Sequence, residues 1–90
     1  LDRDWARATI ARLADDCARL DAAAQSRGWT LVGGTPLFRL YETGDALAAQ
    51  EVLARGRIWS RVFQQKPGWL RLGLPGYEAE WSRVSAALSR

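Results

Sequence analysis

Two arginines, Arg61 and Arg71, carry the clearest chemical signal in the sequence. Each lies in a short segment of alternating apolar and polar residues, and a QQKPG loop joins the two segments. A hairpin closed by this loop, with Phe63 opposite Trp69, would also set Arg61 opposite Arg71. Like charges that face each other on neighbouring strands lower stability, so the pair indicates that an anion binds there.

The chemistry of such a pair is the recognition of carboxylate or phosphate. A guanidinium group binds either anion through two parallel hydrogen bonds. Trp59, Phe63 and Trp69 alternate onto the same face and would exclude water from it. In the alternative interpretation both arginines are solvated, or each pairs with an acidic residue such as Glu42 or Glu78. The spacing alone leaves both interpretations open.

Other reactive groups are scarce. The sequence contains no histidine, a single cysteine, Cys17, and no carboxylates at metal-ligand spacing, so a metal site and a hydrolytic triad have little support. Lys66, the one lysine, lies in the polar loop beside Pro67, where the amine is not desolvated into a nucleophile. No catalytic or metal-binding residue is therefore predicted in this chain.

Length and charge describe one modest domain. The 90 residues carry a net charge of +3, which is weak evidence for nucleic acid or any other partner. The abundance of arginine and alanine suggests a GC-rich bacterial genome. The sequence has no methionine and opens within a helical pattern, so we expect a fragment of a longer chain. No apolar run reaches the length of about 18 residues that would cross a membrane, and the lone cysteine fits a reducing cytoplasm.

Three helices are predicted. The first runs from about Asp4 to Arg27 with one apolar face and Gly28 as its C-cap, a length of roughly 35 Å. It is long for so small a domain, and we expect it to reach beyond its own core. The second covers Ala46 to about Arg55. The third carries an apolar stripe of Tyr77, Trp81, Val84 and Leu88.

Four strands complete the prediction. Trp29 to Val32 and Leu37 to Tyr41 are joined by a bend at GGTP, and the two arginine-bearing segments supply the other two. Arg39, within the second strand, is interpreted as a solvated charge. The element order indicates an α+β domain with a small mixed sheet and helices packed on one face, in which the last strand inserts between the second and third.

The segments GGTPLFRL, GRIWSRVF, WLRLGLPG and YEAEW, in this order and spacing, resemble the C-terminal end of L-threonine O-3-phosphate decarboxylases. These are pyridoxal-phosphate enzymes of cobalamin (vitamin B12) biosynthesis, related to histidinol-phosphate aminotransferases. The resemblance implies that residues 1–90 form the small C-terminal domain of a fold type I enzyme, which closes over the substrate. The large domain that carries the cofactor is then absent, and we expect this chain alone to be inactive.

The resemblance also implies roles for the two arginines. Arg71 matches the arginine that binds the substrate α-carboxylate, and Arg61 matches a second arginine that contacts an anionic group, most simply the phosphate. The lysine that forms the Schiff base lies before Leu1 in the large domain, and Lys66 does not take its place. The implied reaction is decarboxylation of L-threonine O-3-phosphate, or of a similar phosphorylated amino acid, by a cytoplasmic homodimer that contacts neither nucleic acid nor membrane.

Three other interpretations remain. The small domain of a histidinol-phosphate-type aminotransferase would keep an arginine like Arg71. A basic module for single-stranded nucleic acid would also use arginine and tryptophan on a sheet surface, although the arginines here do not form a continuous stripe. A purely structural domain would use the same aromatic face as a protein interface.

Overall fold

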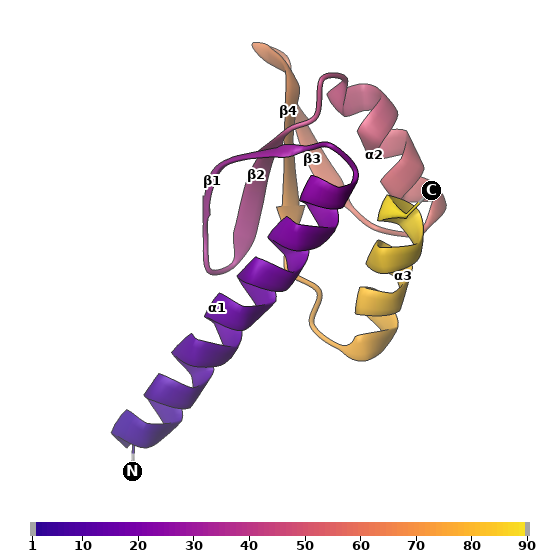
Figure 1. Cartoon of the computed structure of the whole chain (residues 1–90). Coiled ribbons are helices and arrows are strands. Elements are labelled where there is room, and N and C mark those ends of the chain that lie inside the picture. Colours follow the sequence, from indigo (N-terminus) through magenta and orange to yellow (C-terminus); the bar gives the residue numbers. More distant parts are fainter. Residues whose placement is uncertain (1, 90) are drawn as a thin grey trace.

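The computed structural model describes residues 2–89, in which three helices and four strands follow one another in the predicted order (Figure 1). The bounds are α1 Asp2–Ser26, β1 Thr30–Thr35, β2 Phe38–Glu42, α2 Ala46–Arg55, β3 Ser60–Phe63, β4 Lys66–Gly73 and α3 Glu78–Leu88. The second helix has the predicted bounds, and Asp45 caps it through a hydrogen bond from the Ala48 amide.

The four strands form one sheet in the order β1-β2-β4-β3. As predicted, β4 inserts between β2 and β3. Every neighbouring pair is antiparallel, so the expectation of a mixed sheet is wrong in this respect. The reason is the insertion itself, because β2 and β3 both run antiparallel to β4 and therefore parallel to each other without touching.

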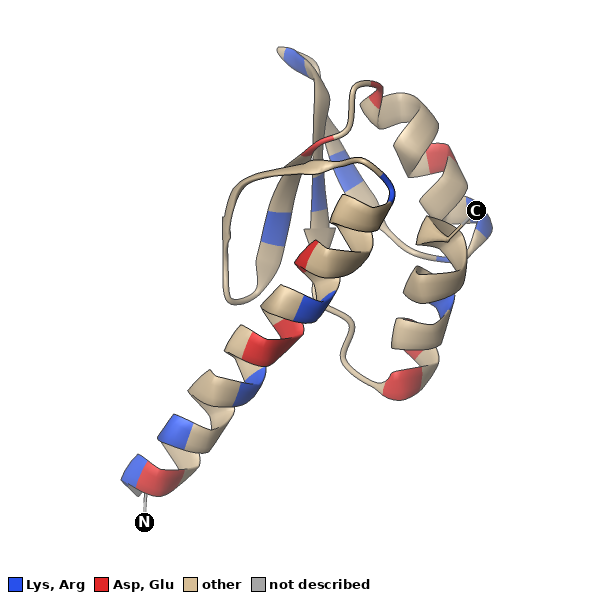
Figure 2. Ribbon diagram, in the orientation of Figure 1, with Lys and Arg blue, Asp and Glu red and all other residues tan. Residues whose placement is uncertain are grey.

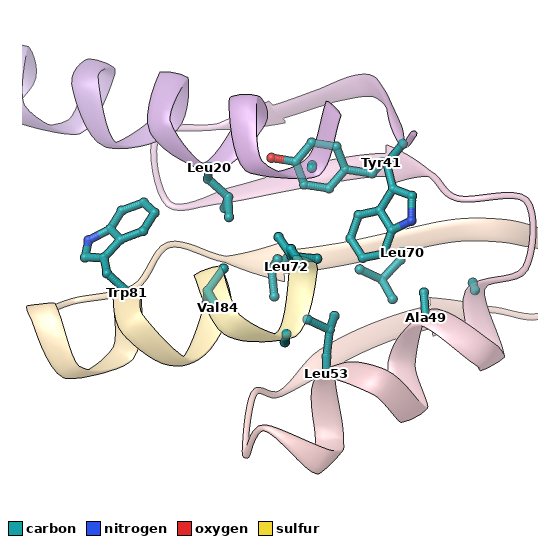
Figure 3. Close-up of a cluster of buried hydrophobic side chains, with 13 residues drawn as sticks. Leu20, Tyr41, Ala49, Leu53, Leu70, Leu72, Trp81 and Val84 are labelled. Carbon is teal, nitrogen blue, oxygen red and sulfur yellow. The ribbon is translucent and has the colours of Figure 1, made fainter. Parts of the chain in front are cut away.

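The core lies between the sheet and the three helices. Tyr41, Leu70 and Leu72 point from the sheet toward Leu20 of α1, Leu53 of α2 and the apolar side of α3 (Figure 3). Burial of each large apolar side chain contributes about 1.5–3 kcal/mol. The buried set is Leu20, Ala24, Trp29, Tyr41, Ala46, Ala49, Leu53, Leu70, Leu72, Trp81, Val84, Ala87 and Leu88.

The first helix is anchored only by its C-terminal half. Leu20 and Ala24 are fully buried, whereas Trp5 is 73% exposed and Ile10 66%, and the N-terminal turns stand away from the sheet (Figure 1). The predicted extension beyond the core is confirmed. Gly28 follows the helix in the left-handed conformation, with φ 92°, which confirms its role as the C-cap residue.

The predicted bend at GGTP is partly wrong, because both glycines belong to β1. The chain turns at Pro36 and Leu37 instead. A bulge between Leu31 and Gly33 shifts the register, and Gly34, at φ 155°, leaves so little room that a Cβ atom there would lie 2.5 Å from the Phe38 carbonyl oxygen. The glycines therefore distort the strand without ending it.

Two further predictions need correction. Tyr77 precedes α3 as its N-terminal flanking residue, in an extended conformation, and is 62% exposed, so it does not join the apolar stripe. Trp81, Val84 and Leu88 do form that stripe. The QQKPG loop is also shorter than expected, since only Gln64 and Gln65 form the turn and β4 already begins at Lys66.

Candidate anion-binding face of the sheet

One face of the sheet is covered by the helices, and the other, which we call the open face, is not. Residues directly opposite on neighbouring strands share a face. Since Tyr41 is paired with Leu70 and both are buried in the core, their neighbours along each strand point the other way. The open face comprises Phe38, Leu40 and Glu42 of β2, Trp69, Arg71 and Gly73 of β4, and Arg61 of β3.

Arg61 and Arg71 are directly opposite each other on the open face. This register was predicted from the sequence and is confirmed, and Figure 2 shows basic residues on these neighbouring strands. Directly opposed residues have Cβ atoms about 4.5–5.5 Å apart. Two positive side chains are therefore presented from adjacent points of a rigid sheet.

The predicted register holds from Ser60 to Val62 and is wrong at Phe63. Phe63 is opposite Lys66 and not opposite Trp69, because the register shifts between Val62 and Phe63. The bulge accommodates the residues of β4 near the turn that have no partner on β3. Its effect stops before Arg61, so the arginine pair is preserved.

Each arginine leans over an aromatic ring. The guanidinium carbon of Arg71 lies 4.9 Å from the centre of the Phe38 ring, and that of Arg61 lies 5.9 Å from the centre of the Phe63 ring. These cation–π contacts restrain both side chains. Phe38 lies toward the C-terminal end of β4 and Phe63 toward the hairpin turn, so the two guanidinium groups diverge and their repulsion falls.

Neither arginine of the pair takes part in an ion pair within residues 2–89. The acidic partners considered from the sequence are engaged elsewhere: Glu78 pairs with Arg19 at 3.1 Å, and Glu42 accepts a hydrogen bond from the Gly44 amide at 3.0 Å. Ion pairs in the described part of the chain include Arg19–Glu78, Arg39–Asp21 and Arg55–Glu51. The two arginines remain available to an external anion.

The aromatic residues predicted beside the arginines are only partly where expected. Phe63 and Trp69 are half-buried, and the Lys66 ammonium lies 5.1 Å from the Trp69 ring centre. Trp59 precedes β3 and is 89% exposed, so it shields nothing within this chain.

Arg39 is not the solvated charge that was predicted. Its guanidinium donates two hydrogen bonds to the Asp21 carboxylate, at 3.0 and 2.8 Å, and both side chains are only 16% exposed. The Tyr41 hydroxyl donates to the same carboxylate at 2.6 Å. This cluster joins α1 to β2 on the helical side of the sheet, so it stabilises the fold and does not add to the open face.

The cluster shifts the acidity of its members. Burial raises the pKa of Asp21, but the hydrogen bonds from Arg39 and Tyr41 outweigh that effect and hold the pKa below its usual value. Burial, together with the bond to Asp21, raises the pKa of the Tyr41 hydroxyl far above its usual value. All three groups therefore keep their charge states at neutral pH.

A broad hollow of about 780 Å³ lies away from the open face, between the end of α1 and α2. Its polar residues already have structural roles: Arg27 donates to the Ala87 carbonyl at 3.3 Å, and Asp45 caps α2. We assign this hollow no chemistry. The described residues also contain no group of three potential metal ligands, and none of their helices has the length and apolarity of a membrane span.

The fold and the open face define a small α+β domain in which two neighbouring arginines form no ion pair with the other residues from 2 to 89. Comparison with known proteins identifies similar chains. Threonine-phosphate decarboxylase of Pseudomonas aeruginosa is 40% identical over 87 residues, which cover 97% of this chain and 26% of that protein. Threonine-phosphate decarboxylase of a Sinorhizobium species is 39% identical over 84 residues, or 93% of this chain and 25% of that protein.

The predicted resemblance to threonine-phosphate decarboxylases is thereby confirmed. The chain spans about a quarter of the length of the curated relatives that it matches. No protein-family model matches the chain.

Proposed function

We propose that this chain is the substrate-binding small domain of a pyridoxal-phosphate-dependent L-threonine O-3-phosphate decarboxylase of cobalamin biosynthesis. Arg71 binds the substrate carboxylate and Arg61 its phosphate. The observation that carries the proposal is the unpaired arginine pair on the open face, in a chain about 40% identical to threonine-phosphate decarboxylases.

The geometry suits a small molecule with two anionic groups. Arg61 and Arg71 start from opposed positions, and their guanidinium groups diverge over Phe63 and Phe38. Two separate anions on one ligand fit this arrangement better than a single anion held between both side chains. Each guanidinium can then bind its own group in a bidentate manner.

The cofactor, when bound, supplies the electron sink for decarboxylation. The described residues offer it no attachment point, because Lys66 is exposed at the hairpin tip and rests against Trp69. In the proposal the cofactor is held by the remainder of a longer enzyme. The contribution of this chain is to fix the direction of the carboxylate, since a bidentate arginine restricts rotation of the group that leaves.

The proposal is tested in the longer enzyme by release of carbon dioxide from L-threonine O-3-phosphate. Truncating one partner of a desolvated charge pair weakens binding by about 2–5 kcal/mol, so we expect Arg71→Ala to lower kcat/KM by about 30- to 5,000-fold. Arg55→Ala is the matched control, because Arg55 is exposed on α2 and pairs only with Glu51. Equal activity of the two variants would contradict the role given to Arg71.

The product distinguishes the decarboxylase from the aminotransferase alternative. Decarboxylation yields carbon dioxide and 1-amino-2-propanol O-2-phosphate, whereas transamination leaves the carboxylate in a keto acid. Arg61→Ala should impair the enzyme more with L-threonine O-3-phosphate than with L-threonine, which lacks the phosphate. An equal loss with both substrates would show that Arg61 does not bind the phosphate.

A further inference from the structure

We infer that Gly73 determines which ligands can reach Arg71. This inference rests on the proposed function. Because Gly73 has no side chain, the space above its Cα atom is open, and the anionic group held by Arg71 occupies that space. Any larger residue at this position would exclude that group from the guanidinium while leaving the fold intact.

The position of Gly73 follows from the sheet register. Gly73 is directly opposite Phe38 on the open face, two residues beyond Arg71. The Arg71 guanidinium leans over the Phe38 ring, 4.9 Å from its centre. The space beside this guanidinium on the β4 side is therefore the space above Gly73.

Nothing within the chain requires a glycine here. A Cβ atom built on Gly73 meets no atom within 4 Å, and its φ angle does not lie in the left-handed region. Gly28 and Gly34 differ, because positive φ angles require glycine at both positions. Gly73 is the last residue of β4 and is still paired with Phe38, so a glycine there weakens the pairing, and the close approach of a ligand to the backbone is one recognised reason for a glycine in a strand.

Gly33 provides a matched control. It is opposite Leu40 on the open face, and a Cβ atom there also meets nothing within 4 Å. However, Gly33 lies on the edge strand β1, and β2 separates it from Arg71. Gly33 therefore has the same open surroundings as Gly73 but no neighbouring guanidinium group, so a side chain added there should not affect a ligand held by Arg71.

The test compares Gly73→Ala, Gly73→Val and Gly33→Val in the longer enzyme, with L-threonine O-3-phosphate as the probe. One carbon more or less in a tight site changes specificity by about 10- to 200-fold. We expect Gly73→Ala, which adds one carbon, to raise KM by about 10-fold, and Gly73→Val, which adds three, to raise it further. Gly33→Val should leave KM unchanged. The melting temperature of all three variants should equal or exceed that of the wild type, because each substitution improves the strand.

An Arg71→Ala variant measured alongside separates two kinds of failure. If Arg71→Ala retains wild-type KM and kcat, the proposed function is wrong and the role of Gly73 falls with it. If Arg71→Ala is impaired but Gly73→Val has the wild-type KM, only the inference about Gly73 is wrong. A rise in KM of equal size in Gly33→Val would also overturn it. If Gly73→Val lowers the melting temperature, the KM of Gly73→Ala, which adds only one methyl group, is used in its place.

Discussion

Replacing Asp21 with alanine should loosen the attachment of α1 to the sheet. The Asp21 carboxylate accepts two hydrogen bonds from Arg39 and one from Tyr41, and its loss leaves a charged and a neutral donor without their acceptor. Removing one partner of a fully buried pair costs about 3–5 kcal/mol. Because Asp21 and Arg39 are 16% exposed and water reaches them in part, we expect a loss of about 3 kcal/mol.

The measurement is urea unfolding followed by circular dichroism. With an m-value of about 1–1.5 kcal/mol/M for a domain of this size, the midpoint should fall by about 2–3 M. Glu51→Ala is the control, since it breaks the exposed pair with Arg55 within α2 and should cost less than about 0.5 kcal/mol.

A double-mutant cycle tests the cause of the loss. Arg39→Met alone strands the Asp21 carboxylate, whereas the double variant Asp21→Ala with Arg39→Met leaves neither charge unpaired. We expect the double variant to be about 2 kcal/mol more stable than the sum of the two single effects predicts. Strict additivity, or an Asp21→Ala variant as stable as Glu51→Ala, would refute the reasoning.

Three further predictions concern the same core. The pKa of Asp21 is lowered on folding. Its contribution to the free energy of unfolding is therefore complete above the unfolded pKa of about 4 and is lost as the pH falls through the lowered pKa. Urea midpoints measured between pH 6 and pH 2 should show this loss in the wild type and not in Asp21→Ala. Tyr41→Phe keeps the buried ring but loses the bond to Asp21, and should lower the free energy of unfolding by about 1–2 kcal/mol in the same urea titration. Trp81 is 6% exposed and Trp5 73%, so Trp81→Ala should cost about 3–5 kcal/mol and Trp5→Ala less than about 0.5 kcal/mol; similar costs would contradict the packing described for α1.

Local patterns in the sequence were sufficient for the order of the elements and for the arginine pair. The alternation of apolar residues around Arg61 and Arg71 fixes which side chains face the core, and a slip by one residue would bury a charge. That constraint preserved their register even though the turn was assigned wrongly. The helical period likewise predicted α1, and Gly28 marked its end.

Local sequence patterns could not predict contacts between elements that are far apart in the chain. Arg39 and Asp21 are 18 residues apart on different elements, and nothing in either segment alone indicates that they meet. One signal was available, because Arg39 shares its strand face with Tyr41, and Tyr41 proved to be fully buried. The proline and glycine of QQKPG led to the wrong prediction of a five-residue loop. Both residues belong to β4 and lie next to a bulge.

These corrections change how the candidate site should be probed. Arg39→Ala is a poor control for the proposed role of Arg71, because it removes a partner of Asp21 and weakens the fold. Arg55, exposed and paired only within its own helix, is the better choice. Stability and ligand binding can then be separated, since the Asp21 cluster and the arginine pair lie on opposite faces of the sheet.

The most direct test of the central claim is a crystal structure of the longer enzyme with L-threonine O-3-phosphate bound and the cofactor withheld, so that the substrate is not consumed. We predict that the ligand lies on the open face. Its carboxylate should lie above Gly73, with the carboxylate oxygens about 3 Å from the Arg71 guanidinium nitrogens, and its phosphate should lie beside Arg61. A ligand bound elsewhere, with Arg61 and Arg71 both facing solvent, would contradict the account.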